Sequence, residues 1–444
     1  MRPIAVLPLG FACIILIGAL LLMLPLSSRE GHAMPFLDAL FTAASATCVT
    51  GLIVVDTGSY FSLFGQAVLL LLIQVGGLGF MTMATILFSL TGRRISLRER
   101  MTLAEGFGEN RLQGMVRLSR AALCVTGVAE GLGALLLSLR FIPLYGFAKG
   151  LWYGLFHSVS AFCNAGFDLI GGYRSFTGFY NDPYTLFILM ALIVVGGLGF
   201  AVIANAAERR RFRRLRLHSK LVLLGTGALI LAGTLLFLLI EHDNPATLGV
   251  MAPGEKLLNA LFESVTLRTA GFNTIDQCAM RDAGKGLGIL LMLVGGAPAG
   301  TAGGLKLTTF ITLFLAMRSY IRARTDTVAF GRTIPLMQVR RALTIFFAGL
   351  AYLVCASLLI SIIEQRAPGG AFGLLNQMFE TASAFCTVGL TNGLTAAASP
   401  ATRLILAFSM YIGRVGLLSL AMALTDRDDG GALIRYPAEE ILIG

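Results

Sequence analysis

Two short glycine motifs recur as a linked pair four times along this chain, and this repetition limits the possible folds more than any other feature. The first motif begins with phenylalanine and ends with glycine, and its copies occupy 41–51, 156–166, 262–271 and 379–389. The second motif follows about 24 to 30 residues later and begins at Gly76, Gly196, Gly295 and Gly413. A pair of motifs repeated in this order indicates four tandem structural units.

Long apolar blocks surround both motifs. The sequence is 56% hydrophobic and 13% charged, a composition typical of membrane proteins. Crossing a hydrocarbon core of about 30 Å takes roughly 20 apolar residues in a helix, and the blocks 66–90 and 184–207 each supply them. A further block precedes each first motif, at 3–26, 121–141, 221–240 and 342–363. We therefore predict a membrane protein whose unit is helix, short segment, helix.

The short segments before the first-motif glycines, such as 35–47 and 151–163, are too short to cross a bilayer. Non-helical backbone survives at membrane depth only where it is buried or lines a water-filled path. The predicted fold is an all-α membrane protein of four tandem helix–pore loop–helix repeats. It has eight transmembrane helices and four re-entrant half-helices in pseudo-fourfold symmetry around one pore. The predicted repeats are 1–92, 118–208, 218–320 with a broken second helix, and 338–426, followed by a cytoplasmic tail at 427–444.

Basic residues are concentrated in three clusters, 93–120, 209–220 and 318–341, which alternate with loops poor in positive charge. By the positive-inside rule these clusters mark the cytoplasmic side, so both termini are predicted to be cytoplasmic. The net charge of +11 is therefore interpreted as membrane orientation and contact with anionic lipid, not as nucleic-acid binding. Docking of a protein partner on these clusters is the alternative.

Each first motif ends in a four-residue segment suited to binding a dehydrated cation. Backbone carbonyls can replace the water shell of potassium if some residues adopt positive φ, which glycine does at little cost. Each segment has one glycine, so we expect a short filter that is occupied by few ions and is less selective. It would bind potassium through backbone carbonyls and hold no transition metal. The candidate filter segments are Cys48, Val49, Thr50, Gly51; Cys163, Asn164, Ala165, Gly166; Arg268, Thr269, Ala270, Gly271; and Cys386, Thr387, Val388, Gly389.

The third copy of the second motif is rich in residues that break helices, so the second helix of repeat three is predicted to break below the filter and form a movable gate. A static kink is the alternative. The candidate gate residues are Gly295, Gly296, Ala297, Pro298, Ala299, Gly300, Thr301, Ala302, Gly303, Gly304 and Lys306, together with Arg414. For the Gly-Gly-Leu-Gly copies at Gly76 and Gly196, close helix packing is favoured over ion contact.

Isolated polar residues lie inside apolar stretches. Arg414 is predicted to face the gate, with extension to the membrane interface as the alternative. Glu130 is interpreted as a hydrogen-bonded structural residue in preference to a proton-coupling one. Arg268 is expected to brace its pore loop. Glu263 and Glu380 are expected at the start of their half-helices. There a negative charge interacts favourably with the positive end of the helix dipole, and it would attract cations.

The four single-glycine loops, the glycine-rich break in repeat three and the arginine in repeat four resemble the Trk/Ktr/HKT superfamily of potassium transporters, and most closely its Ktr-type membrane subunit. The resemblance covers essentially the whole chain. It implies potassium uptake in the bacterial cytoplasmic membrane, with no cofactor in this chain, potassium as the transported ion and sodium as a candidate activator. It also implies a homodimer with one pore per subunit, and a cytosolic nucleotide-binding regulatory ring subunit of the KtrA kind as partner.

In this family glycine at the position of Gly51 accompanies potassium selectivity and serine accompanies sodium transport, and the arginine matching Arg414 forms a barrier with the gate loop.

A secondary transporter of another monovalent cation is the main alternative, although such folds usually contain two inverted repeats and not four similar ones. An enzyme is not predicted, because His32, His157, His218 and His242 are scattered and no convergent nucleophile, base or metal site is visible.

Overall fold

The computed structural model describes residues 3–79, 115–365, 372–417 and 420. The end of block 66–90, most of the 93–120 cluster, the ends of repeats one and four and the tail at 427–444 lie outside these residues. The described elements are almost all helical: α1 Pro3–Met23, η1 Pro25–Ser27, α2 Phe36–Thr47, α3 Thr57–Tyr60, α4 Leu63–Leu78, α7 Met115–Tyr145, α8 Phe147–Phe162, η2 Thr177–Phe179, α9 Pro183–Gly197, α10 Phe200–Arg209, η3 Phe212–Arg214, α11 Leu217–Glu241, α12 Pro253–Thr266, α13 Asp282–Leu293, α14 Leu307–Ile321, β1 Thr327–Ala329, β2 Arg332–Ile334, α15 Leu336–Glu364, α16 Leu374–Phe385, α17 Leu394–Ala397 and α18 Pro400–Val415. The strands β1 and β2 form a small antiparallel hairpin with Val328 opposite Thr333.

Four described helices are long and apolar enough to cross a membrane, namely α1, α7, α11 and α15, and the bent pair α9 and α10 could provide a fifth span. No more than 33% of each of the four spans is buried inside the protein. Leucines such as Leu231 and Leu239 are more than half exposed, a burial pattern suited to hydrocarbon solvent. The prediction of a mostly helical protein with several membrane-spanning helices is therefore confirmed for the described residues.

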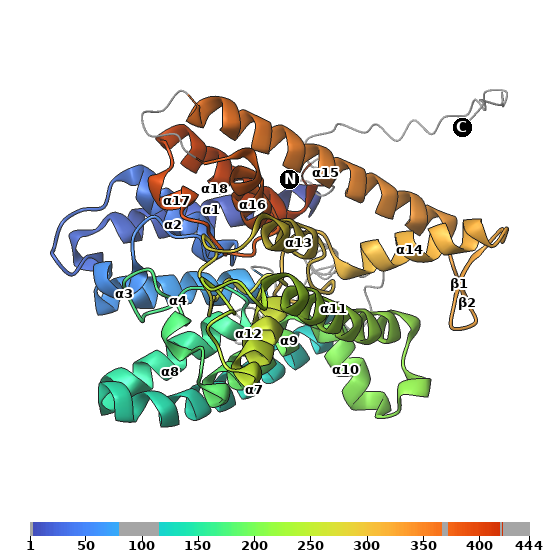
Figure 1. Ribbon diagram of the computed structural model, residues 1–444, viewed down its shortest axis with the longest axis horizontal. Helices are drawn as coiled ribbons and strands as arrows, with labels where there is room; N and C mark the ends of the chain where they lie inside the picture. Colours follow the sequence, from blue (N-terminus) through green and yellow to red (C-terminus); the bar gives the residue numbers. More distant parts are fainter. Residues whose placement is uncertain (1–2, 80–114, 366–371, 418–419, 421–444) are drawn as a thin grey trace.

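Four shorter helices lie among the long ones: α2, α8, α12 and α16, with 12, 16, 14 and 12 residues. At 1.5 Å per residue they are about 18 to 24 Å long, shorter than a hydrocarbon core. The phenylalanine that opens each first motif is completely buried in every one of them. In Figure 1, α12, α13 and α16 lie near the centre, α15 runs along the upper edge, and α7 and α8 lie along the lower edge.

Contacts between the half-helices and the helices that follow them run in a cycle. The helix after each half-helix packs against the half-helix of the next unit: α4 on α8, α9 on α12, α13 on α16, and α18 back on α2. This order closes on itself, so the last quarter of the chain packs against the first.

The helices that carry the second motif all stop at it. Gly79, Gly199 and Gly416 have φ between 80° and 91°, a left-handed conformation that ends α4, α9 and α18. The block 184–207 therefore does not form one straight helix, because α9 and α10 are bent by 94° at Gly199. In repeat three, α13 and α14 are separated at 294–306, where the sequence predicts a break.

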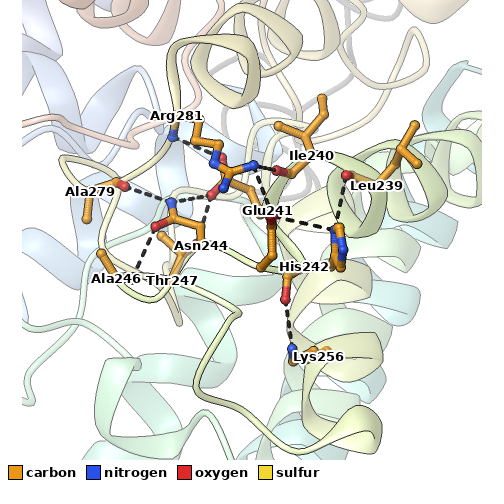
Figure 2. A network of polar contacts seen from close by, with 11 residues as sticks. Leu239, Ile240, Glu241, His242, Asn244, Ala246, Thr247, Lys256, Ala279 and Arg281 are labelled. Carbon is orange, nitrogen blue, oxygen red and sulfur yellow. Dashed lines mark hydrogen bonds and ion pairs between the residues drawn. The ribbon is translucent and has the colours of Figure 1, made fainter.

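The C-terminal end of α11 is joined to the start of α13 by one buried carboxylate (Figure 2). Glu241 Oε1 accepts from the Arg281 backbone N–H at 2.9 Å, and Glu241 Oε2 accepts from Asn244 at 2.6 Å and Thr247 at 2.8 Å. The Arg281 side chain bonds to exposed Asp243 at 2.9 Å, which lowers the pKa of that carboxyl. Glu364 makes the corresponding link in repeat four, accepting from Ser399 N–H and Oγ at 3.0 and 2.8 Å.

We expect Glu241→Ala to destabilise the protein by about 2 to 4 kcal/mol, because it removes a buried carboxylate that accepts three hydrogen bonds. Thermal unfolding of the purified protein in detergent measures the effect. Asp243→Ala is the matched control, since it removes a neighbouring carboxylate whose exposed ion pair with Arg281 contributes little to stability. Equal losses for the two variants would contradict the assigned role of Glu241.

Candidate functional site

The four candidate filter segments begin where the half-helices end, and all four have the same backbone form. The glycine of each segment has φ between 69° and 95°. The second residue of each segment also has positive φ, between 53° and 73°, although none is glycine; these residues are Val49, Asn164, Thr269 and Thr387. Positive φ at such residues is unfavourable, so the surrounding contacts must enforce it.

A hydroxyl residue at the fifth position of each first motif supplies such contacts. Its carbonyl accepts from the third residue of the segment, at 2.7 to 2.9 Å. The hydroxyls of Ser45 and Ser383 accept from the N–H of the segment glycine, at 3.1 and 3.0 Å. The hydroxyls of Ser160 and Thr266 instead donate to the carbonyl of the residue that follows the segment glycine, at 2.7 and 2.5 Å. The sequence analysis missed these four residues, although a hydroxyl four positions after the phenylalanine is visible in every copy.

The four glycines lie next to one another in a closed ring. A Cβ on Gly51 would lie 2.5 Å from the Ala165 carbonyl oxygen, and one on Gly166 would lie 2.8 Å from that of Ala270. The same contact continues from Gly271 to Val388 at 2.7 Å, and a Cβ on Gly389 would overlap the Thr50 carbonyl. The structure thus brings together all four predicted segments, in cyclic order. Only glycine fits at these positions, because a side chain would displace the neighbouring carbonyl.

Two predicted polar residues lie behind the ring. Arg268 is buried and donates to Thr226 of α11 at 3.3 Å, so its contact with the scaffold is a single hydrogen bond. Glu130 of α7 accepts from Gln74 of α4 at 3.1 Å, and its other oxygen lies 3.6 Å from the Cys163 sulfur. Glu130 is therefore hydrogen-bonded between two helices and a filter segment, the geometry expected of a structural glutamate.

The expected position of Glu263 and Glu380 is wrong. Glu263 lies in the last turn of α12 and Glu380 in the second half of α16, because both helices begin well before the phenylalanine of the motif. Both carboxyls are completely buried and bond to the loop that follows the filter segment. His157, at the same motif position in repeat two, accepts from the Leu169 N–H at 3.1 Å.

The predicted gate residues are held by the second motifs of the other repeats. The N–H groups of Ala297 and Thr301 donate to the Gly197 and Gly196 carbonyls at 2.9 and 3.2 Å. The Gly304 N–H donates to the Gly413 carbonyl at 3.3 Å. Within the gate segment, Lys306 Nζ donates to the Ala302 carbonyl at 2.7 Å.

Arg414 extends from the last turn of α18 into this cluster. Its guanidinium donates to the Thr301 carbonyl of the gate segment and to the Gly76 carbonyl of α4, and it reaches the Gly77 carbonyl at 3.1 Å. The sequence analysis anticipated the contact with the gate segment but not the contact with α4. Arg414 thus joins three repeats at one point.

Gly76, Gly196 and Gly413 also allow close packing. A Cβ on any of them would overlap the carbonyl at the end of a half-helix, that of Thr47, Phe162 or Phe385 respectively. The packing interpretation of Gly76 and Gly196 agrees with this geometry, and the same glycine motifs also hold the gate segment.

Comparison with known proteins gives a consistent result. Residues 13–429 match the model of the family TrkH, described as cation transport protein. The Ktr system potassium uptake protein B of Bacillus subtilis is 40% identical over 442 residues, covering 100% of this chain and 97% of that protein. The potassium/sodium uptake protein NtpJ of Enterococcus hirae is 40% identical over 445 residues, covering 100% and 98%. The crystal structure of the potassium transporter TrkH from Vibrio parahaemolyticus has a similar fold, with a TM-score of 0.72 at 17% identity over 94% of this chain and 85% of that one.

Proposed function

This chain belongs to the TrkH family of cation transport proteins, and we propose from that premise that it is the potassium-conducting membrane subunit of a Ktr/Trk-type uptake system. The observation that carries the proposal is the closed ring of four glycine segments, each at the end of a half-helix. Among the described residues, no group of three His, Cys, Asp or Glu side chains could hold a metal ion, and the ring offers backbone carbonyls, which suit a dehydrated alkali cation.

In this proposal the pore is formed by four repeats, each with two membrane helices and one half-helix. The repeat boundaries are those that the sequence predicts. The half-helices direct their carbonyl ends toward the ring, so each adds a favourable interaction of about 0.3 to 1 kcal/mol with a cation. The cyclic packing of α4, α9, α13 and α18 on the next half-helix supports this arrangement.

Potassium entry is then driven by the membrane potential, with both termini and the basic clusters on the cytoplasmic side of the cytoplasmic membrane. A potential of 100 mV contributes about 2.3 kcal/mol per elementary charge, which corresponds to roughly fortyfold accumulation. No ATPase is needed in this chain.

The gate in this proposal is the segment 295–304 with Lys306, closed by Arg414. The chain acts as a homodimer with one pore per subunit, regulated by a cytosolic nucleotide-binding ring that contacts its basic cytoplasmic face. Sodium is the candidate activator. The exposed cations of 209–220 and of 318–341 are available for such a partner in the described residues.

Growth of a potassium-uptake-deficient bacterium on low potassium tests the function. We expect the native chain to rescue growth when the ring subunit is present. We expect Gly51→Ser to abolish rescue or to lower the preference for potassium over sodium at least about tenfold, equivalent to 1.4 kcal/mol. The reason is that a serine Cβ would lie 2.5 Å from the Ala165 carbonyl oxygen at a φ of 95°.

Gly131→Ser is the matched control, because Gly131 lies on the exposed face of α7 with no atom within 4 Å of an added Cβ. We expect it to rescue like the native chain. If the native chain is present in the membrane but does not rescue growth, the proposal is contradicted. The chain would then be a transporter of another cation or a coupled transporter.

A further inference from the structure

Glu263 and Glu380 occupy the same motif position in repeats three and four, yet their hydrogen-bond surroundings differ. Both side chains are completely buried beside the loop that leaves the filter segment. A buried carboxyl needs either donors for its oxygens or a proton of its own, because an unpaired buried charge is strongly unfavourable. The donors around each carboxyl therefore indicate its protonation state.

Glu380 is surrounded by donors. Its Oε1 accepts from the Thr391 hydroxyl at 2.7 Å, from the Thr395 N–H at 3.1 Å and from the Thr395 hydroxyl. Its Oε2 accepts from the Asn392 N–H at 3.1 Å. Four donors from one loop suit an ionised carboxylate, which is a pure acceptor.

Glu263 has a single donor. Its Oε2 accepts from Gln277 Nε2 at 3.2 Å. Its Oε1 has no hydrogen-bond partner, and neither has Oε1 of the same Gln277. No Lys or Arg of the described chain forms an ion pair with Glu263. Two acceptor oxygens are thus left unpaired on two side chains already in contact.

A single proton removes both defects. We propose that Glu263 is protonated in the folded protein and forms an acid–amide pair with Gln277, whereas Glu380 is ionised. The acid O–H donates to Gln277 Oε1 while the amide N–H donates back to Glu263 Oε2, so both groups are satisfied. A small metal cation would need about six oxygen ligands, and this contact offers two free ones.

The neighbouring charges favour the same state. Among the described helices, α9 and α11 pack most extensively against α12. Their titratable residues are Tyr184, His218, Lys220 and Glu241. Of these, Glu241 acts on Glu263 with a like charge, which opposes a second ionised carboxyl nearby. Glu263 is therefore a positioning residue that holds the loop after filter segment three without adding charge beside the pore.

The test compares glutamine variants at the two equivalent positions, with thermal unfolding of the purified full-length protein as the readout. Glu263→Gln keeps a donor and an acceptor toward Gln277, so we expect its Tm within about 1 °C of the native value, whereas Glu263→Ala falls by at least about 3 °C. Glu380→Gln directs an amide donor at existing donors, so we expect a fall of at least about 3 °C. Glu380→Asn is not informative, because it also shortens the side chain.

Rising pH gives a second readout. A carboxyl protonated in the folded protein and ionised in the unfolded chain lowers stability as pH rises above its unfolded pKa. Between pH 5.5 and 7.5 we expect the native Tm to fall by about 3 °C more than that of Glu263→Gln. Equal pH dependence of the two proteins, or a Glu263→Gln loss as large as that of Glu263→Ala, would overturn the proposal. A rise in Tm with sodium over choline that occurs in the native chain and is lost in Glu263→Gln would overturn it in favour of a cation bound at Glu263.

These stability measurements do not depend on transport, so they can fail or succeed independently of the proposed function. Where uptake is measured as well, which rests on the proposed function, we expect Glu263→Gln to transport like the native chain and Glu380→Gln to be impaired.

Discussion

Gly389→Ala is expected to lower potassium uptake at least about thirtyfold at equal amounts of protein in the membrane. Gly389 has a φ of 94°, and a methyl group there would overlap the Thr50 carbonyl oxygen and lie 3.0 Å from the Gly51 Cα. Holding alanine in this conformation costs on the order of 2 kcal/mol, which alone corresponds to about thirtyfold. Displacement of the Thr50 carbonyl adds to this, because ion binding depends on where these oxygens lie.

Gly227→Ala provides the control for this substitution. Gly227 lies on α11 with nothing within 4 Å of an added Cβ, and alanine is a better helix former than glycine by about 1 kcal/mol. Uptake by Gly227→Ala should equal that of the native chain. If Gly389→Ala also transported normally, the ring of glycine segments would not be the permeation path.

The candidate filter could be found from the sequence because glycine marks its position four times. The terminal glycines are intrinsically suited to positive φ, so the local residue type identifies the segment. Val49 and the equivalent residues of the other segments could not be recognised, because their left-handed conformation comes from the end of the half-helix and the serine or threonine beneath it. That hydroxyl was visible in the alignment of repeats, but its role depends on a backbone geometry that residue type does not define.

The contacts of the candidate gate segment could not be predicted from the sequence, although its break could. Helix-breaking residues predicted the interruption between α13 and α14 from local propensity alone. The bonds from this segment to Gly196, Gly197 and Gly413 join residues about 100 positions apart, and no local pattern contains them. The 94° bend at Gly199 was also missed, since the glycines of a Gly-Gly-Leu-Gly motif in an apolar block are compatible with a continuous membrane helix.

The expected place of Glu263 and Glu380 was wrong because the start of their half-helices was placed too late in the sequence. The structure begins these helices at Pro253 and Leu374, several residues earlier. Helix ends are set by caps and by the packing of the preceding loop, and motif conservation between repeats gives no information on either. Glu263 therefore lies ten residues and Glu380 six residues after the start of its helix, and both carboxyls are buried.

Arg414→Gln is expected to raise potassium flux about tenfold to a hundredfold, including flux in the absence of the ring subunit. The Arg414 guanidinium bonds to the Thr301, Gly76 and Gly77 carbonyls, so the native side chain both ties the gate segment in place and puts a positive charge beside it. At about 5 Å and an effective dielectric constant of 20, that charge opposes a passing cation by about 3 kcal/mol. Misfolding cannot account for a gain in flux, which makes the direction of this prediction informative.

Arg414→Lys separates the two contributions of the arginine. Lysine keeps the charge but lacks the planar fork that reaches carbonyls on two repeats at once. If the electrostatic barrier dominates, Arg414→Lys should conduct like the native chain; if the ties to Thr301 and Gly76 dominate, it should leak like Arg414→Gln. Purified protein in potassium-loaded liposomes, with flux followed by a potential-sensitive dye, measures both. A loss of flux in Arg414→Gln with normal flux in Arg414→Lys would instead show that the charge is needed for conduction, and Arg414 would then not be the barrier.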